Sequence, residues 1–258
     1  IDKYNEECRS IVMRYSSEWR KTITRVGRWI DFDNDYKTLD PTFMESVWWV
    51  FQQLHAKGLV YRGFKVMPYS TACNTPLSNF EAGLDYRDVS DPAVLVKFPL
   101  QNETNTFFVA WTTTPWTIPA NKALAYNSNL IYLVVKINDE GDFKNKKIIV
   151  AKDLLETLIK ECEIKSFDVQ KEFLGKEFKG TTCSHPFLDI GYSYDIPMLE
   201  GRFVTTEQGS GIVHCAPSHG PDDFNLCLNN NIKALETVDD DGRYTKNIIK
   251  FDRIHIFK

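Results

Sequence analysis

The chain has 258 residues, of which 43% are hydrophobic and 26% charged, and its net charge is −4. These values are typical of a globular protein with one large domain or two small ones, and they exclude a disordered or fibrous chain. The acidic balance argues against non-specific coating of nucleic acid, which needs many Lys and Arg contacts to phosphates, but not against a nucleic acid delivered by another part of a larger protein.

Two helices are predicted near the N-terminus. Apolar residues recur at intervals of three and four over residues 2–26, and Gly27 follows as a C-terminal cap. The second helix begins with Asp40 as N-cap and Pro41 in the first turn, and it ends at Lys57-Gly58. Three tryptophans lie in or between these helices, namely Trp29, Trp48 and Trp49. We expect them to pack in a core.

From about residue 90 the pattern changes to short runs rich in Val, Ile and Phe, which predict strands. The expected strands are 94–98, 106–112, 130–137, 147–151, 202–206 and 211–214. The first two flank a polar turn, which predicts a hairpin, and an amphipathic helix is expected over 152–162. Helices followed mostly by strands indicate an α+β fold with a barrel-like core and peripheral helices. We divide the chain into a helical connecting segment, 1–80, and a core domain, 81–258.

The six cysteines contain no C-x-x-C pair, which argues against a disulfide framework and a zinc knuckle. Buried free thiols in a reducing compartment are expected instead. No apolar run approaches the ~18 residues of a membrane span, and no signal-peptide pattern is present. Because the chain opens mid-helix without a Met, we expect a fragment of a larger cytosolic protein.

The string WTTTPWTIPAN at residues 111–121, here called the threonine motif, is the first candidate for chemistry. A predicted strand ends in three consecutive hydroxyls, Thr112, Thr113 and Thr114, and Pro115 prevents continuation of the strand ladder. Each hydroxyl both donates and accepts hydrogen bonds, which suits an ester carbonyl, a ribose hydroxyl or a water. The three threonines alone are better explained as a β-edge before a proline turn, whereas the complete string is much more specific.

The string GSGIVHCAPSHGPDD at residues 209–223, here called the histidine motif, allows three interpretations. A metal site lacks helical ligand spacing, paired cysteines and an evident third ligand. A nucleophile pair of Cys215 with His214 or His219 is weaker, because adjacent residues on a strand point apart. In the third interpretation Pro221 starts a helix and one of the two following aspartates binds a cationic group, while the other caps the helix.

Together the two motifs resemble the paired signatures of the editing domain inserted into isoleucyl-tRNA synthetases, which are class I aminoacyl-tRNA synthetases. Residues 27–51 and 61–81 are similar to the connecting segment of the same family in its eukaryotic cytosolic form, so the likeness covers nearly the whole chain. The sister editing domains for valine and leucine usually carry Arg where this chain has Thr114, which favours isoleucine specificity. Residues 246–258 match least well.

The resemblance implies post-transfer editing, in which a positioned water hydrolyses the ester of valyl-tRNA(Ile). It implies that Asp223 binds the α-ammonium of the amino acid, that Thr113 and Thr114 surround the ester and terminal ribose, and that His214 sets the pocket size. The other residues that the resemblance places at the substrate are Thr112, Trp116, Asn121, Gly211 and His219.

No string is similar to the ATP-binding HIGH and KMSKS signatures, and no phosphate-binding glycine loop is present. We therefore expect no metal and no cofactor in this chain, with ATP and Mg required only at a synthetic site elsewhere. The expected partners are the acceptor end of tRNA(Ile) carrying valine and the remainder of the synthetase chain, without a membrane. Two alternatives stay open: an editing domain for valyl- or leucyl-tRNA synthetase, and a non-catalytic tRNA-positioning module.

Overall fold

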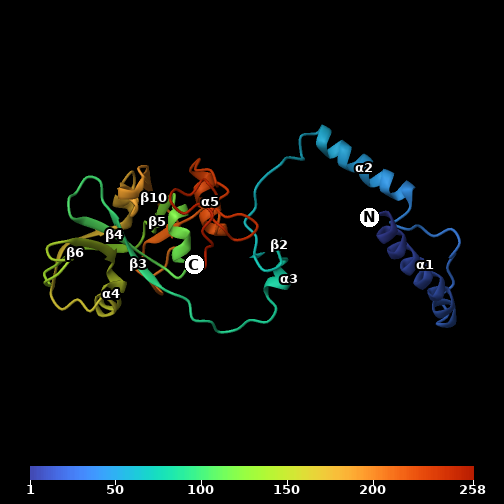
Figure 1. Ribbon diagram of the computed structural model, residues 1–258, viewed down its shortest axis with the longest axis horizontal. Coiled ribbons are helices and arrows are strands. Elements are labelled where there is room, and N and C mark those ends of the chain that lie inside the picture. The colour runs from blue at the N-terminus through green and yellow to red at the C-terminus, as the bar shows by residue number, and fades with distance from the viewer. The chain divides into compact units, whose positions relative to one another are not determined.

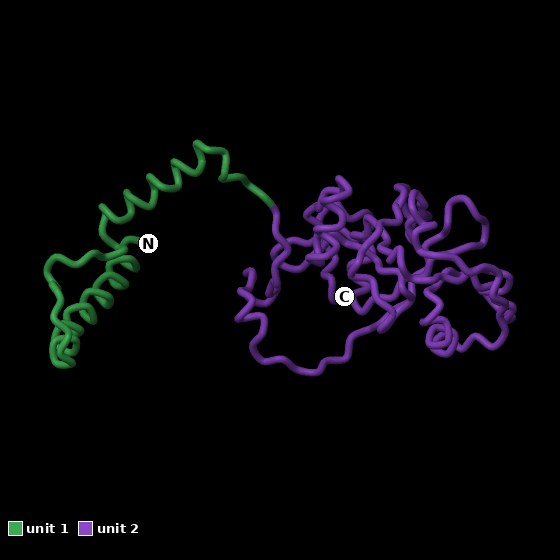
Figure 2. The backbone as a smooth tube through the Cα atoms, turned by 180° about the vertical axis from the view of Figure 1, so that it is seen from behind, with its two compact units in different colours: residues 1–63 green, residues 64–258 purple.

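The computed structural model describes all 258 residues and divides them into two compact units, residues 1–63 and 64–258. Figure 2 colours the two units separately. Each unit is described by itself below. The division of the chain at residue 80 stays a prediction about its functional organisation.

Helix α1 (Asp2–Arg25) occupies the predicted segment of the first unit. Gly27 follows it with a φ of +82°, and Arg28 N donates to Ile23 O at 3.2 Å. A left-handed glycine with this backbone bond is the usual way to satisfy the last carbonyls of a helix. The predicted C-terminal cap is therefore confirmed.

Helix α2 (Pro41–Ala56) also begins where its sequence predicts, with Asp40 at the N-cap and Pro41 at the first helical position. The Asp40 carboxylate makes no capping hydrogen bond, so the boundary depends on the fixed φ of the proline. Gly58, with a φ of +71°, follows the end of the helix, as predicted.

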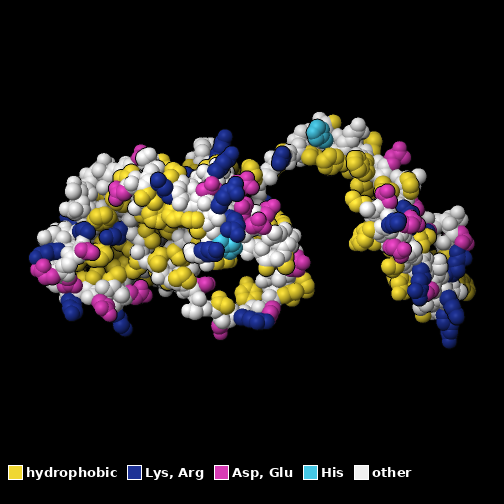
Figure 3. Space-filling model, in the orientation of Figure 1, with side chains coloured by type: hydrophobic (Ala, Val, Ile, Leu, Met, Phe, Trp, Pro, Cys, Tyr) yellow, Lys and Arg dark blue, Asp and Glu magenta, His cyan; other side chains and the backbone are white.

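The expectation that the three tryptophans of this unit pack in a core is wrong. Trp29, Trp48 and Trp49 are 90%, 75% and 60% exposed, and neither α1 nor α2 has a buried residue. Figure 3 shows hydrophobic side chains along the surface of both helices. An apolar stripe is buried only when another layer covers it, and this unit contains no such layer.

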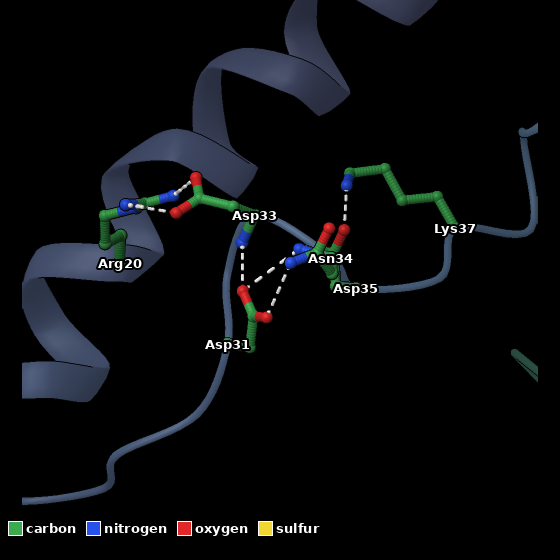
Figure 4. Close-up of polar contacts among 6 residues, drawn as sticks. All are labelled: Arg20, Asp31, Asp33, Asn34, Asp35 and Lys37. Carbon is green, nitrogen blue, oxygen red and sulfur yellow. Dashed lines mark hydrogen bonds and ion pairs between the residues drawn. The ribbon is translucent and has the colours of Figure 1, made fainter.

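The loop between the two helices is held by exposed polar contacts (Figure 4). Arg20 of α1 forms an ion pair with Asp33, and Asp31 accepts hydrogen bonds from Asp33 N at 2.9 Å and Asn34 N at 3.0 Å. The Asn34 side chain also donates to Asp31, and these bonds lower the pKa of the Asp31 carboxyl. Exposed pairs of this kind contribute little to stability, so they shape the loop without giving the unit a core.

A five-stranded sheet forms one part of the second unit (Figure 1). In spatial order its strands are β3 (Val94–Pro99), β4 (Thr106–Thr112), β7 (Lys147–Ala151), β6 (Ile131–Ile137) and β8 (Phe167–Leu174). Only β4 and β7 are parallel. The predicted hairpin of β3 and β4 and the predicted strands β6 and β7 are confirmed.

A four-stranded sheet forms the other part. In spatial order its strands are β11 (Val213–Cys215), β5 (Ala123–Tyr126), β10 (Asp195–Glu200) and β9 (Thr182–Ser184). Strand β5 runs parallel to β10 and antiparallel to β11. This pairing places the strand that follows the threonine motif beside the histidine motif, with Ala123 opposite Cys215.

The two sheets are open, and they share one core instead of closing into a barrel by continuous strand pairing. They meet at a bridge between Leu100 and Cys183 and at the bond from Ala151 N to Ser210 O, 2.8 Å long. Large, fully buried side chains fill the shared core, among them Phe98, Phe108, Leu124, Tyr132 and Ile196. The predicted α+β class is confirmed.

Short helices connect the strands. They are α3 (Asn79–Ala82), α4 (Leu155–Glu161), α5 (Pro221–Asn229) and the 3-10 turns η1 (Pro115–Ala120), η2 (Lys152–Leu154), η3 (Gly175–Phe178) and η4 (Leu188–Ile190). A two-stranded hairpin of β1 (Tyr69–Ser70) and β2 (Thr75–Pro76) precedes α3. The predicted helix over 152–162 is present as η2 followed by α4. No helix has the length and hydropathy of a membrane span.

The strand predicted at residues 202–206 is wrong. The chain turns there, with Val204 N donating to Gly201 O at 3.2 Å and Asn127 Nδ2 donating to Val204 O at 3.0 Å. Val204 is only 1% exposed and packs against a cluster that includes Ala125. The turn thus buries the apolar side chain that had indicated a strand.

The strand predicted at residues 211–214 begins later, at Val213, because Gly211 has a φ of +75° that no extended strand adopts. Strands β1, β2, β5, β8, β9 and β10 were not predicted. Strand β8 is exposed at nearly every position, so it has no alternation of apolar and polar residues to reveal it.

The cysteines are all free thiols, but the expectation that they are buried is correct for only half of them. Cys183, Cys215 and Cys227 are buried, whereas the remaining three are exposed, namely Cys8, Cys73 and Cys162.

Candidate active site

A cavity of about 300 Å³ lies where β4 ends, between η1, β11 and the start of α5. It brings together the threonine and histidine motifs, which are far apart in the sequence. The predicted site residues that line it are Thr112, Thr113, Thr114, Gly211, His214, His219 and Asp223. Trp116 and Asn121, which were also predicted, do not line it.

The three threonines reach the cavity from the end of β4. Thr112 is buried, and its hydroxyl accepts a hydrogen bond from Thr114 N at 3.1 Å and lies 3.2 Å from the Thr114 hydroxyl. Thr113 and Thr114 are exposed. Since Pro115 follows directly and starts η1, the strand stops here and the alternation of faces no longer applies. All three residues line one cavity.

His214 is held at both ring nitrogens. Its Nε2 lies 2.8 Å from Thr117 Oγ1, and its Nδ1 lies 2.6 Å from Asn121 Nδ2, which also donates to Ala123 O at 2.9 Å. An amide nitrogen only donates, so Nδ1 of His214 accepts and the ring proton is on Nε2. Burial lowers the pKa of His214 to about 3. The ring is therefore neutral and fixed in one tautomer.

Thr117 links this histidine to the threonines. Its hydroxyl donates to Thr114 O at 2.8 Å, and its backbone N–H donates to the same carbonyl at 2.9 Å. The Thr117 hydroxyl therefore connects the backbone of Thr114 to the ring of His214. Asn121, which is 0% exposed, supports the site through His214 and not by contact with the cavity.

Asp223 is the carboxylate that faces the cavity. It lies in the first turn of α5, and its Oδ2 accepts a hydrogen bond from Ala216 N at 2.8 Å. Burial raises the pKa of this carboxyl to about 6. Asp222, one residue earlier, is exposed and does not line the cavity. Of the two aspartates considered from the sequence, the structure therefore places Asp223 at the site.

His219 forms a wall of the cavity and is also held in place. Its Nε2 lies 2.7 Å from Thr237 Oγ1, and its ring packs edge-on against Trp116 with centroids 4.8 Å apart. Burial lowers the pKa of His219 to about 4. Trp116 lines a second cavity, of about 410 Å³, on the other side of His219. Trp116 thus supports a wall of the site without lining it.

Gly211 permits the close approach of the histidine motif to the five-stranded sheet. A Cβ atom at this position would lie 2.4 Å from the Cβ of Ala151, and the φ of +75° already disfavours other residues. Its carbonyl accepts a hydrogen bond from the Tyr132 hydroxyl at 2.7 Å. The segment is therefore fixed where it enters the cavity.

Other residues that line the cavity were not predicted as site residues from the sequence, namely Trp111, Thr117, Phe203, Thr205, Gln208, Gly209, Ser210, Ile212, Val213 and Ala216. Thr117 was detectable, because it lies three residues after Thr114 in a motif that a proline turns into a helix. Nothing in the sequence marked the loop residues Thr205 and Gln208 as site residues, because it is the turn after β10 that brings them to the cavity.

The alternative chemistries considered for the histidine motif have little geometric support. No group of three or more His, Cys, Asp or Glu side chains is arranged to hold a metal ion. Cys215 is fully buried, its thiol donates to Val213 O, and burial raises its pKa well above the ordinary value. It forms no hydrogen bond with either histidine, whose Nε2 atoms bond Thr117 and Thr237. A nucleophilic Cys–His pair is therefore not formed.

The sequence matches the model of a known protein family and is similar to several proteins of known activity. The family model described as tRNA synthetases class I (I, L, M and V) matches residues 1–208. The chain is 51% identical over its whole length to the isoleucine–tRNA ligase of Pelagibacter ubique, covering 29% of that protein. It is 48% identical over 97% of its length to the cytoplasmic isoleucine–tRNA ligase of Mus musculus, covering 20% of it.

The chain thus spans less than a third of the length of these relatives. Among solved structures, the editing domain of the P. falciparum cytosolic leucyl-tRNA synthetase aligns with a TM-score of 0.44 at 13% identity, over 55% of this chain and 68% of that one.

Proposed function

Because the chain belongs to the class I tRNA synthetase family and is homologous to isoleucine–tRNA ligases across its length, we propose that it hydrolyses the ester bond of tRNA(Ile) misacylated with valine. One observation carries this proposal. A single cavity combines a partly buried carboxylate, that of Asp223, with the hydroxyls of Thr113 and Thr114. A carboxylate suits an amino acid's ammonium, and hydroxyls suit an ester and a water.

Asp223 holds the α-ammonium of the attached amino acid in this proposal. Opposite charges about 4 Å apart attract by about 4 kcal/mol at an effective dielectric near 20, before desolvation is subtracted. With its pKa raised to about 6, the free carboxyl is ionised at neutral pH, and a bound ammonium stabilises the ionised form further. The carboxylate therefore anchors the amino acid through its α-ammonium.

Thr113 and Thr114 position the water and the ester carbonyl. An aminoacyl ester is already activated, so hydrolysis requires a placed water and a polarised carbonyl more than a strong nucleophile. The water oxygen bonds to the carbonyl carbon, the bond from that carbon to the ribose oxygen breaks, and the ribose oxygen takes up a proton that the water gives up. Free valine and intact tRNA leave. Thr112 contributes by holding Thr114 through its backbone N–H.

His214 limits the size of the amino acid that the cavity admits. Its ring is neutral and bonded at both nitrogens, so it acts as a fixed wall instead of a base. One methylene separates isoleucine from valine by only about 1–3 kcal/mol on binding, a magnitude already established for this pair of amino acids. A second, smaller site is needed to remove the resulting errors, and rejection of isoleucine by overlap with a rigid wall meets that need.

The remainder of the synthetase is the proposed partner of the first unit. Helices α1 and α2 expose their apolar residues, among them Trp48 at 75% and Phe51 at 56%. Exposed apolar patches of this kind mark interaction surfaces. Amino-acid activation with ATP and Mg belongs to that remainder, and the editing step needs no cofactor. A cytoplasmic location agrees with the names of the mouse and Arabidopsis thaliana relatives.

A deacylation assay with valyl-, threonyl- and isoleucyl-tRNA(Ile) tests the proposal. We expect valyl-tRNA(Ile) to be cleaved and isoleucyl-tRNA(Ile) to be spared. Cleavage of threonyl-tRNA in preference to valyl-tRNA would favour the specificity of a valyl-tRNA synthetase. Binding of tRNA without any hydrolysis would favour a positioning module.

A further inference from the structure

The turn η1 contains one carbonyl that its own backbone cannot satisfy. In a 3-10 turn each carbonyl accepts from the N–H three residues later. Thr114 O follows this rule with Thr117 N at 2.9 Å, and Ile118 O follows it with Asn121 N at 3.0 Å. The carbonyl of Trp116 would require the N–H of residue 119, which is a proline and has none. The turn therefore needs a donor from elsewhere in the chain.

Tyr244 supplies that donor from 128 residues away. Its hydroxyl donates to Trp116 O at 2.5 Å. The Tyr244 ring is only 6% exposed and packs in a cluster with Ala120, Ala216 and Ile248. This cluster connects both motifs to residues 235–258, here called the C-terminal segment. Burial raises the pKa of Tyr244 to about 12, so the hydroxyl keeps its proton at any working pH.

The same segment also holds the histidine motif. Thr237 bonds to His219 Nε2 at 2.7 Å, and the Ser218 hydroxyl donates to Leu235 O. Two further side chains bond to carbonyls in or next to the turn, but neither replaces a missing backbone donor: Tyr194 donates to Asn121 O at 2.8 Å, and His185 Nε2 lies 3.1 Å from Ile118 O.

We propose that Tyr244 is a positioning residue for the deacylation site, acting through the Trp116 carbonyl to fix the turn that carries Thr114 and Thr117. Thr117 is the neighbour of Trp116, and its hydroxyl bonds both Thr114 O and His214 Nε2. Movement of the Trp116 peptide therefore moves the Thr114 hydroxyl, which positions the water, and the His214 ring, which limits the size of the amino acid, together. This inference rests on the proposed function, and it gives the C-terminal segment a part in the reaction.

The substitution Tyr244→Phe tests this, because it keeps the ring and removes only the hydroxyl. Tyr192→Phe is the matched control: Tyr192 is buried in the adjoining aromatic cluster, and its hydroxyl donates to Ile249 O at 2.8 Å, a carbonyl outside the turn. Each variant loses one hydroxyl–carbonyl bond, so we expect similar losses of thermal stability from the two.

Only Tyr244→Phe should change the site. We expect its kcat for valyl-tRNA(Ile) to fall about fivefold, the rate equivalent of one net hydrogen bond, with a smaller change in KM. We also expect faster hydrogen exchange at the Thr117 and Asn121 amides than in Tyr192→Phe. Equal kcat values and equal exchange in the two variants would overturn the inference.

The two proposals fail separately in this experiment. A wild-type chain that cleaves no aminoacyl-tRNA contradicts the proposed function, while the exchange rates still decide whether Tyr244 fixes the turn. A wild-type chain that cleaves valyl-tRNA(Ile), with Tyr244→Phe indistinguishable from Tyr192→Phe in kcat and exchange, contradicts only the role of Tyr244.

Discussion

Asn121 holds His214 in a single tautomer, with its Nδ2 atom 2.6 Å from the Nδ1 atom of the ring. The same amide nitrogen donates to Ala123 O, which fixes the orientation of the amide. Since Thr117 engages the other ring nitrogen, His214 has no free nitrogen to act as a base. In the proposed function, its position in the cavity wall makes it a steric element, and this has a direct consequence for specificity.

We expect His214→Ala to enlarge the cavity and weaken the rejection of isoleucine. The ratio of valyl- to isoleucyl-tRNA(Ile) cleavage should fall by roughly tenfold to a hundredfold, the range that one methylene allows. Both rates are measured under single-turnover conditions. Unchanged hydrolysis of both substrates would show that His214 does not limit the cavity.

The pH dependence should report Asp223. Its pKa is raised to about 6, so the carboxylate is lost as the pH falls through that value. The α-ammonium of the substrate is lost above a pKa of about 7.7–8.0, so kcat/KM should be greatest between these limits. The rates are corrected for spontaneous ester hydrolysis. A profile that stays flat from about pH 5 to 7 would argue against an ionised Asp223 in binding.

The same raised pKa makes Asp223 unfavourable for stability at neutral pH. The folded-state pKa of about 6 exceeds the ordinary value of 3.8, so the folded state is favoured at low pH and loses that advantage as the pH rises through 6. Asp223→Asn should therefore raise the free energy of unfolding by roughly 1–3 kcal/mol at about pH 8 and by little near pH 4.

Urea denaturation at the two pH values measures this effect. Asp222→Asn is the control, because Asp222 lies in the same helical turn but is exposed. A gain for Asp223→Asn that is the same at both pH values, or absent at the higher one, would contradict the assigned burial of the Asp223 carboxylate.

Gly211→Ala should destabilise the second unit through both backbone strain and overlap. The new Cβ would lie 2.4 Å from the Cβ of Ala151. Gly180→Ala is a matched control, with a φ of +81° but nothing within 4 Å of the new Cβ. We expect Gly211→Ala to lose roughly 1–3 kcal/mol more than Gly180→Ala, the usual range for overpacking. Equal losses in urea denaturation would mean that the two segments do not pack closely at Gly211.

The parts of the fold that local chemistry determines were predictable from the sequence. Gly27 and Pro41 mark a helix end and a helix start by their backbone preferences alone, and the structure places both as predicted. The strand at 202–206 failed, because Val204 is buried by a turn whose partners are distant in the sequence. The prediction that Trp48 is buried was wrong for another reason, because a sequence pattern identifies an apolar helix face but not what covers that face.

The candidate site was predictable in part. The two motifs pointed to one site, and the cavity contains residues from both. The residue pattern alone left Asp222 and Asp223 open, and the family resemblance favoured Asp223, which lines the cavity. The place of Trp116 could not be predicted, because it depends on packing against His219. The proposed role of Tyr244 could not be predicted from the sequence, because it depends on a carbonyl left unpaired by Pro119 and on a contact across 128 residues.

Deacylation of valyl-tRNA(Ile) by Asp223→Ala, beside Asp222→Ala, tests the central claim most directly. The two aspartates are neighbours in the same helical turn, and only Asp223 lines the cavity. Loss of an ammonium–carboxylate pair worth about 4 kcal/mol predicts a fall in kcat/KM of roughly a hundredfold or more for Asp223→Ala, and Asp222→Ala should stay close to the wild-type rate. An Asp223→Ala variant that keeps the wild-type rate within a few-fold would contradict the account.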